Sequence, residues 1–234
     1  MIPLPVPPFR IGSKLKNTDK KLLEIYNLLF QRYGPQHWWP GDSPFEVMVG
    51  AILTQSAAWQ NVEKAINNLK TAGVISPAAL RNIPTLELAQ LIHPSGYYNA
   101  KALKLKALVR WLRTSCRDNL DELFTLDTGE LRRQLLDVHG IGPETADSIL
   151  LYAGNKPVFV IDAYTRRIFS RLGLLQENDT YNAWQTFFIS NLPQKIELYN
   201  EYHALLVRLG KEACRKHPVC NSCCLRAICQ YRPG

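Results

Sequence analysis

The chain of 234 residues is long enough for one large domain or two modest ones. Hydrophobic residues make up 46% of it and charged residues 21%, a balance that permits a sizeable core and excludes global disorder. Lysine and arginine outnumber aspartate and glutamate by 28 to 20, and the formal charge of +8 favours a polyanionic partner, with nucleic acid ahead of a membrane surface.

The first residues are rich in proline, with four prolines among the first eight. We expect residues 1–12 to form an extended arm, because prolines disfavour a helix. The same prolines exclude the apolar helix of a signal peptide. No run approaches the roughly 20 apolar residues that cross a membrane. We therefore expect a monomeric, cytoplasmic protein of prokaryotic type, associated with the nucleoid and without a membrane partner.

Apolar residues recur at helical spacing along almost the whole chain, whereas strand-like alternation is scarce. Residues 43–46, Ser-Pro-Phe-Glu, are the clearest helix start, with a serine cap and a proline at the first helical position. The short apolar stretch 158–161 suits a buried extended linker. The predicted fold class is all-α. The periodicity predicts helices at 19–33, 43–53, 61–71, 77–82, 86–91, 100–116, 120–124, 128–138, 144–153, 164–172, 181–191 and 197–211.

The segment 139–146 reads His-Gly-Ile-Gly-Pro-Glu-Thr-Ala and joins two of these helices. Gly140 and Gly142 permit backbone conformations that other residues avoid and let the backbone approach a ligand closely. The first turn of the second helix, which contains Thr145, can then direct its amides at a phosphate, while Ile141 points inward. An ordinary glycine-rich turn is the alternative explanation.

A Gly-x-Gly hairpin followed further along by an aspartate resembles the helix–hairpin–helix DNA glycosylases, such as endonuclease III. The matching aspartate is Asp162, which precedes a predicted helix. The resemblance implies that Asp162 is catalytic. A carboxylate at a helix start stays ionised near neutral pH, stabilises the oxocarbenium ion that forms as a base leaves, and aligns the attacking water. A simple helix cap is the structural alternative.

Endonuclease III carries a lysine two residues after the second glycine of its hairpin, and this lysine forms a Schiff base with the sugar. The corresponding residue here is Glu144, which cannot form an imine. We therefore predict a monofunctional glycosylase that leaves an abasic site and has no lyase activity. Nothing in the sequence marks Lys156 as a replacement for the lysine.

An enzyme that flips a base out of DNA holds it between aromatic faces, and Trp38 and Trp59 are the candidates. Gln55 matches the residue that related enzymes insert into the gap, and Glu144 completes the predicted pocket. Core tryptophans and an exposed helix-end glutamine are the alternatives. The sequence is similar to 3-methyladenine DNA glycosylase III, which implies an alkylated purine substrate, in the segments 38–40, 45–46, 49–55, 94–101 and 140–142.

Five cysteines crowd the C-terminal end, and four have the spacing Cys214-x5-Cys220-x2-Cys223-x5-Cys229. Four thiolates this close in sequence can surround one metal centre, and the spacing alone leaves zinc and a [4Fe–4S] cluster open. The pattern resembles that of endonuclease III, which implies the [4Fe–4S] cluster. Cys224 is then a spare residue, and Cys116 belongs to the core.

The resemblance implies two helical lobes that flank a DNA-binding cleft. One is a six-helix lobe at 38–156 that ends with the hairpin. The other joins 1–37 to 157–234 and carries the cluster. The expected partner is double-stranded DNA with a damaged base. The predicted DNA-binding residues are Gly140, Ile141, Gly142, Thr145, Arg166, Lys211 and Lys216, of which the positive Arg166, Lys211 and Lys216 are expected to contact phosphates.

Three functions compete. The first is a monofunctional glycosylase for alkylated purines such as 3-methyladenine. The second is an endonuclease III-like glycosylase for oxidised, deaminated or mismatched bases. The third is a non-catalytic DNA-binding protein in which the metal site is only structural.

Overall fold

The computed structural model describes residues 16–232 of the chain. These residues form twelve α-helices, one π-helix and three short 3-10 helices, and they contain no β-strand, so the all-α prediction is confirmed. The proline-rich arm predicted at 1–12 lies outside the described residues. No helix in the described part of the chain is both long and apolar enough to cross a lipid bilayer.

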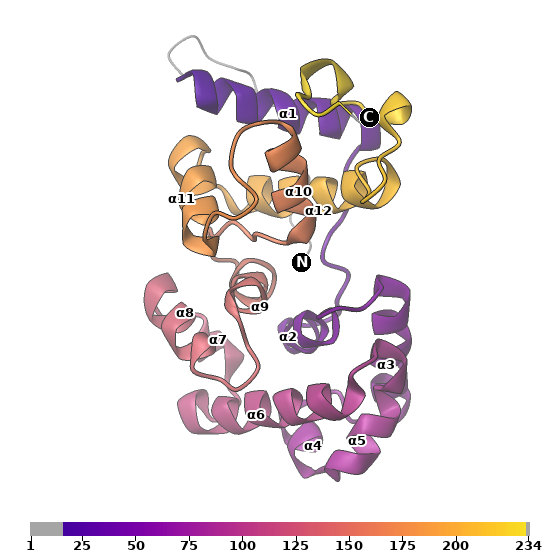
Figure 1. The fold of residues 1–234 in the computed structure, drawn as a ribbon. Helices are drawn as coiled ribbons and strands as arrows, with labels where there is room; N and C mark the ends of the chain where they lie inside the picture. Colours follow the sequence, from indigo (N-terminus) through magenta and orange to yellow (C-terminus); the bar gives the residue numbers. More distant parts are fainter. Residues whose placement is uncertain (1–15, 233–234) are drawn as a thin grey trace. The chain divides into compact units, whose positions relative to one another are not determined.

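Contacts between Cα atoms divide the chain into two compact units. The first unit contains the described residues of Met1–Trp39 and Pro157–Gly234, and the second contains Pro40–Lys156. The boundary between them follows Trp39, whereas the predicted boundary lies before Trp38. Figure 1 shows both units coloured along the sequence.

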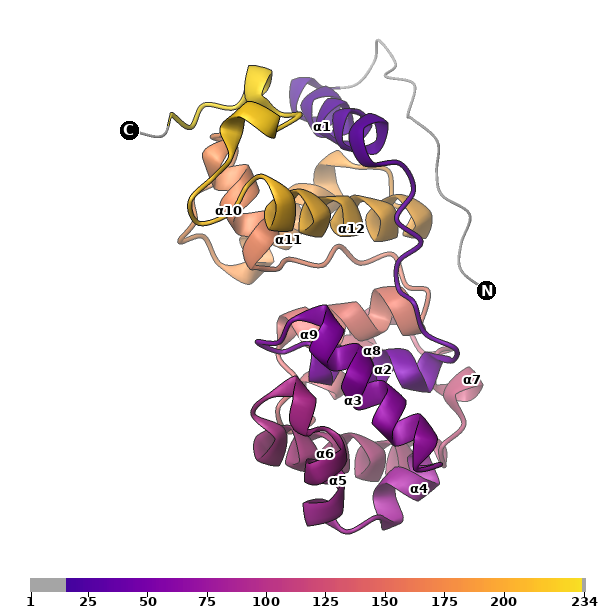
Figure 2. The same ribbon diagram turned by 90° about the vertical axis from the view of Figure 1, so that its right-hand side faces the viewer.

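The first unit is built around α12 (Ile196–Glu212), which packs against α1 (Asn17–Tyr33) and α10 (Ala163–Arg171). Figure 2 shows α12 running past both helices, with α11 (Tyr181–Asn191) beside it. Residues 198–206 of α12 are buried on every side, as expected for a helix that neighbours cover on more than one face. The polar groups of residues 198–206 therefore lie inside the unit.

An extended segment at 157–162 crosses the core of this unit. Its residues 158–161 are almost completely buried, as the sequence predicted. The Phe159 ring stacks on Phe188 of α11 with centroids 4.0 Å apart and meets Tyr202 of α12 edge-on at 5.8 Å. Two hydrogen bonds with α11 also hold the segment. The Gln185 side-chain amide donates to the Phe159 carbonyl at 3.0 Å, and the Ile161 backbone amide donates to the Tyr181 hydroxyl at 3.3 Å.

The second unit surrounds one buried helix, α2 (Pro44–Leu53), of which every residue from Phe45 to Leu53 is buried. The Ser43 hydroxyl accepts a hydrogen bond from the Glu46 amide at 3.2 Å and Pro44 occupies the first turn, which confirms the predicted helix start. The other helices of this unit are α3 (Trp59–Thr71), α4 (Pro77–Asn82), α5 (Thr85–Leu91), the 3-10 helix His93–Ser95, α6 (Tyr98–Cys116), α7 (Leu120–Leu123), α8 (Thr128–Leu136), α9 (Pro143–Ser148) and the π-helix Ile149–Ala153.

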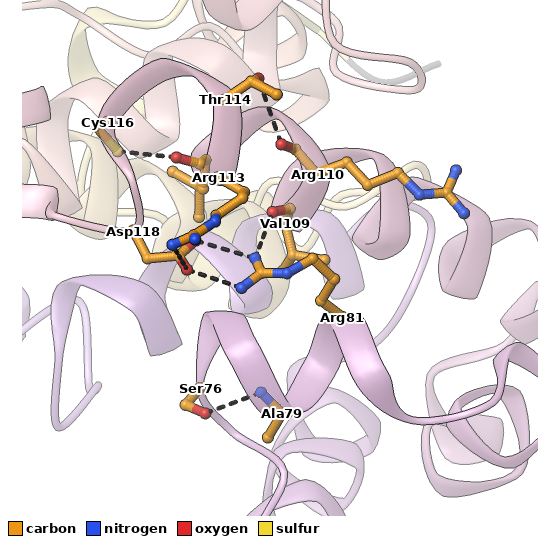
Figure 3. A network of polar contacts seen from close by, with 10 residues as sticks. Ser76, Ala79, Arg81, Val109, Arg110, Arg113, Thr114, Cys116 and Asp118 are labelled. Carbon is orange, nitrogen blue, oxygen red and sulfur yellow. Dashed lines mark hydrogen bonds and ion pairs between the residues drawn. The ribbon is translucent and has the colours of Figure 1, made fainter.

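Polar contacts fasten α6 to its neighbours. Figure 3 shows Arg81 of α4 paired with Asp118, which follows α6, through two hydrogen bonds of 3.0 and 2.8 Å, while the same guanidinium donates to the Val109 carbonyl. The buried Lys101 donates to the carbonyls of Leu53 and Ser95 at 2.8 and 2.7 Å. Burial and the neighbouring charge of Lys104 lower the pKa of Lys101 to about 8.

The predicted helix bounds differ from the structure mainly at starts that have no side-chain cap. Helix α3 begins at Trp59 and α6 at Tyr98, each two residues earlier than predicted. Their N-cap residues, Ala58 and Tyr97, make no side-chain cap hydrogen bond, so the sequence holds no start signal there. The predicted helix at 144–153 continues beyond α9 as a π-helix, which hydrophobic periodicity does not distinguish from an α-helix.

Candidate active site and cysteine cavity

Asp162 ends the buried extended segment and caps α10. Its Oδ1 atom accepts a hydrogen bond of 2.7 Å from the Thr165 amide, and only 8% of the residue is exposed. The side chain is therefore the N-cap that the structural alternative describes. The cap does not exclude catalysis, because a carboxylate at the positive end of a helix stays available as an anion.

The second oxygen of this carboxylate faces α12. The Nε2 atom of His203 lies 3.5 Å from Asp162 Oδ2, and His203 is 6% exposed. Burial raises the pKa of Asp162, but His203 and the Thr165 hydrogen bonds outweigh it, so the pKa lies below its ordinary value. His203 is not among the residues predicted from the sequence, because a histidine within an apolar helical stretch carries no signal of its partner.

The segment that carries Trp38 is anchored on the same helix. Glu201 of α12 accepts a hydrogen bond of 2.7 Å from the Gln36 backbone amide. Burial raises the pKa of Glu201, and the Gln36 hydrogen bond and His37 offset part of this effect. Trp38 is half-buried and its ring centroid lies 5.0 Å from that of the buried Trp39. Trp38 and Asp162 therefore belong to one unit, and α12 contacts both the segment before Trp38 and the carboxylate.

The glycine hairpin lies in the second unit, between α8 and α9. Gly140 has a φ of 82°, and a Cβ atom there would overlap the side-chain carbons of Lys104. Gly142 is the N-cap of α9 with a φ of −92°, and a Cβ atom there would meet nothing within 4 Å. Ile141 is 5% exposed and points inward, as predicted. Only Gly140 needs the conformational freedom of glycine, whereas Gly142 leaves open space in front of the helix.

Side chains from outside the hairpin brace it. Arg132 of α8 binds Asp147 of α9 through two hydrogen bonds of 2.7 and 3.1 Å, and Asp147 is fully buried. The Gln55 amide nitrogen donates to the Gly140 carbonyl at 3.0 Å and to the Thr145 hydroxyl at 2.9 Å. Lys104 donates to the Gln55 amide oxygen at 2.5 Å. Gln55 thus holds the hairpin in this conformation. Its insertion into DNA stays a prediction, and insertion would require these hydrogen bonds to break.

The remaining residues of the predicted pocket belong to the second unit. Glu144 is exposed on the first turn of α9, and Trp59 is half-buried at the start of α3. Lys156 donates to the Leu126 carbonyl at 2.8 Å, so its ammonium group holds a loop. Trp59, Gln55 and Glu144 therefore lie in the unit that does not contain Asp162.

The predicted phosphate contacts of the first unit differ in how firmly they are held. Arg166 donates to the Asp179 carbonyl at 2.7 Å and lies over the Trp184 ring, so it stabilises a loop. Lys211 and Lys216 are exposed. Lys216 also borders a cavity of about 520 Å³ with Arg167 and Arg171. The two lysines are available to a phosphate without breaking such contacts.

The clustered cysteines share one cavity of about 790 Å³, which Cys214, Cys220, Cys223, Cys224 and Cys229 all line. All of them are free thiols. Arg171 of α10 donates to Cys214 Sγ at 3.3 Å and to the Arg215 carbonyl at 2.7 Å. Within residues 16–232, however, no three side chains of His, Cys, Asp or Glu are arranged as a metal site. Cys116 lies apart from the cavity and is buried, as predicted.

Known proteins are similar to this chain in sequence and in fold. Residues 49–194 match the family model described as HhH-GPD superfamily base excision DNA repair protein. A protein of Methanocaldococcus jannaschii named as a DNA repair glycosylase is 44% identical over 92% of this chain and 98% of its own length. The crystal structure of Helicobacter pylori 3-methyladenine DNA glycosylase (MagIII) bound to 1,N6-ethenoadenine is 29% identical, with a TM-score of 0.73 over 84% of this chain and 98% of that one.

A non-covalent endonuclease III–DNA complex has the same fold, with 21% identity and a TM-score of 0.79 over 92% of this chain and 96% of the endonuclease III chain. The family model covers more than half of this chain, and the archaeal relative covers nearly all of it. The chain therefore belongs to the HhH-GPD superfamily, the family of base excision repair DNA glycosylases.

Proposed function

We propose that this glycosylase is monofunctional and removes an alkylated purine such as 3-methyladenine from double-stranded DNA. Two features together carry the proposal. Asp162 is buried and its pKa is lowered, and Glu144 stands at the hairpin position where endonuclease III carries lysine. In the proposed mechanism the anion of Asp162 stabilises the positive sugar and aligns the attacking water. Glutamate cannot form a Schiff base, so the strand stays intact.

An alkylated purine suits this chemistry. 3-Methyladenine is positively charged in DNA, so it is a good leaving group without a general acid, and an aspartate alone suffices. Aromatic faces such as those of Trp38 and Trp59 attract a cationic base by about 0.5–2 kcal/mol per contact. The likeness to a 3-methyladenine glycosylase, which was solved with 1,N6-ethenoadenine, supports the same class.

A base-release assay tests this proposal. The panel is duplex DNA methylated with dimethyl sulfate, together with defined duplexes that contain 1,N6-ethenoadenine, 8-oxoguanine, thymine glycol, uracil or a T·G mismatch. We expect release of alkylated purines by the wild-type protein and loss of release in Asp162→Asn, which keeps the side-chain shape and removes the charge. Release of oxidised or mismatched bases alone would show that the substrate class is wrong.

Borohydride trapping tests the absence of lyase activity separately. We expect no covalent protein–DNA adduct with the wild-type protein. Glu144→Lys is the matched variant, because it restores the amine at the lyase position and should give an adduct. An adduct with the wild-type protein would contradict the proposed role of Glu144, and Lys156→Ala would then test the nearest lysine along the chain.

We propose that Cys214, Cys220, Cys223 and Cys229 hold a [4Fe–4S] cluster. The proposal is supported by four free thiols that line one cavity with room for a multi-atom group. The cluster would act as a structural cross-link, because its ligands tie the C-terminal segment to the end of α12. Absorbance near 400 nm and the iron content test the proposal. Cys223→Ala should lose both, whereas Cys224→Ala, which alters the same cavity wall, should keep them.

A further inference from the structure

Helix α12 carries three buried polar side chains in an otherwise apolar stretch. Asn200, Glu201 and His203 are only 6%, 5% and 6% exposed. Buried polar groups cost free energy unless they have a partner, so each is expected to serve a specific contact. Glu201 holds the Gln36 amide, as described above. His203 contacts the carboxylate of Asp162, with 3.5 Å between Nε2 and Oδ2.

Capping of α10 needs only one oxygen of Asp162. The Thr165 amide binds Oδ1 at 2.7 Å, and the orientation of the carboxylate plane about its Cβ–Cγ bond then depends on what holds Oδ2. His203 contacts the other oxygen from a different helix and so fixes that plane from a second direction. A separation of 3.5 Å is long for a hydrogen bond, but contacts of this kind often tighten when substrate binds.

The charge of Asp162 also depends on this neighbour. A carboxylate that is 8% exposed loses most of its hydration, which disfavours the ionised form. A donor N–H on His203 Nε2 restores part of that stabilisation, and it can do so in the neutral imidazole as well as in the imidazolium.

We propose that His203 is a positioning residue of the glycosylase reaction, which holds the carboxylate of Asp162 in one orientation and keeps it ionised. The proposal rests on the proposed function, in which the anion of Asp162 faces the developing positive sugar. His203 touches no substrate in this role. Its effect passes through Asp162, as do the effects of residues that orient the ligands of a metal site.

Single-turnover base release from duplex DNA methylated with dimethyl sulfate tests the proposal, in full-length His203→Leu and His203→Gln variants. Affinity is measured separately on a duplex with a tetrahydrofuran abasic site. We expect His203→Leu to lower the maximal rate about 10–100-fold, the range typical of lost orienting contacts, with unchanged affinity. His203→Gln, whose amide can donate to Oδ2, should recover at least part of the rate.

Tyr202→Phe is the matched control, because Tyr202 is the buried neighbour in α12 and its hydroxyl binds the Leu22 carbonyl at 2.8 Å. This variant should lower the melting temperature and leave the maximal rate unchanged. If His203→Leu does not fold, His203→Asn replaces it, because its amide is too short to reach Oδ2.

The outcomes separate the two proposals. If Asp162→Asn keeps its activity, the proposed function of Asp162 fails, and the role of His203 fails with it. If Asp162→Asn is inactive but His203→Leu or its replacement keeps the wild-type rate, only the positioning role is overturned. It is also overturned if His203→Gln recovers nothing, or if Tyr202→Phe loses as much rate as His203→Leu.

Discussion

Replacing Gly140 by alanine should destabilise the fold, whereas replacing Gly142 by alanine should weaken DNA binding and leave the fold intact. Gly140 has a φ of 82°, in the left-handed region that costs an alanine about 1–2 kcal/mol. The new methyl group would also overlap the side chain of Lys104, which must move and give up its hydrogen bond to Gln55, worth about 1 kcal/mol. Gly140→Ala should therefore lower the free energy of unfolding by about 2–3 kcal/mol.

Gly142→Ala is the matched variant. Its φ of −92° suits alanine, and nothing lies within 4 Å of the added methyl group, so its stability should stay within about 0.5 kcal/mol of wild type. The methyl group would stand in front of the α9 amides, where a phosphate is expected to bind. We therefore expect weaker binding to duplex DNA from a substitution that leaves the fold intact.

Thermal unfolding and fluorescence anisotropy with a labelled duplex measure the two effects separately. A loss of 2–3 kcal/mol corresponds to a fall of about 4–12 °C in melting temperature for a chain of this size. A melting temperature within one or two degrees of wild type for Gly140→Ala would refute the strain argument. Wild-type affinity for Gly142→Ala would show that DNA does not approach the backbone at this residue.

Other predictions concern buried charges. Arg132→Met should lower the free energy of unfolding, measured in urea, by about 3–5 kcal/mol, because it leaves the fully buried Asp147 without its ion pair; Asp147→Asn in the same chain should restore part of the loss, and an unchanged midpoint would contradict the pairing. Lys101→Met should cost at least about 1–3 kcal/mol, because two buried carbonyls lose their donor, and a stability equal to wild type would show that other groups satisfy them. Glu201→Gln should stabilise the protein at pH 7–8, because a raised folded-state pKa means that the ionised carboxylate disfavours the fold, and this disadvantage disappears as the pH falls to the unfolded pKa near 4. Urea unfolding of wild type and Glu201→Gln from about pH 4 to about pH 8 measures the difference between their free energies of unfolding. A difference that does not change with pH would refute the prediction.

Local signals in the sequence were sufficient for the fold class and for most of the helices. Apolar periodicity reports which face of a segment is buried, and Ser43 and Pro44 report a helix start through contacts within a few residues. The glycine hairpin, Asp162 and the cysteine spacing were also visible, because each is a short pattern whose chemistry depends on near neighbours. The same locality explains the errors at Trp59 and Tyr98, where the helix start has no capping side chain.

Only the tertiary structure brought together residues that are far apart in sequence. The contact between His203 and Asp162, the hold of Gln55 and Lys104 on Gly140, and the use of Arg166 for a loop each depend on how whole helices pack. Packing is decided by the fit of many side chains at once, and no single residue records its partner in the sequence. The sequence thus determined which chemical groups are present and on which helices they lie. The packing decided which of these groups stabilise the fold and which contact one another at the site.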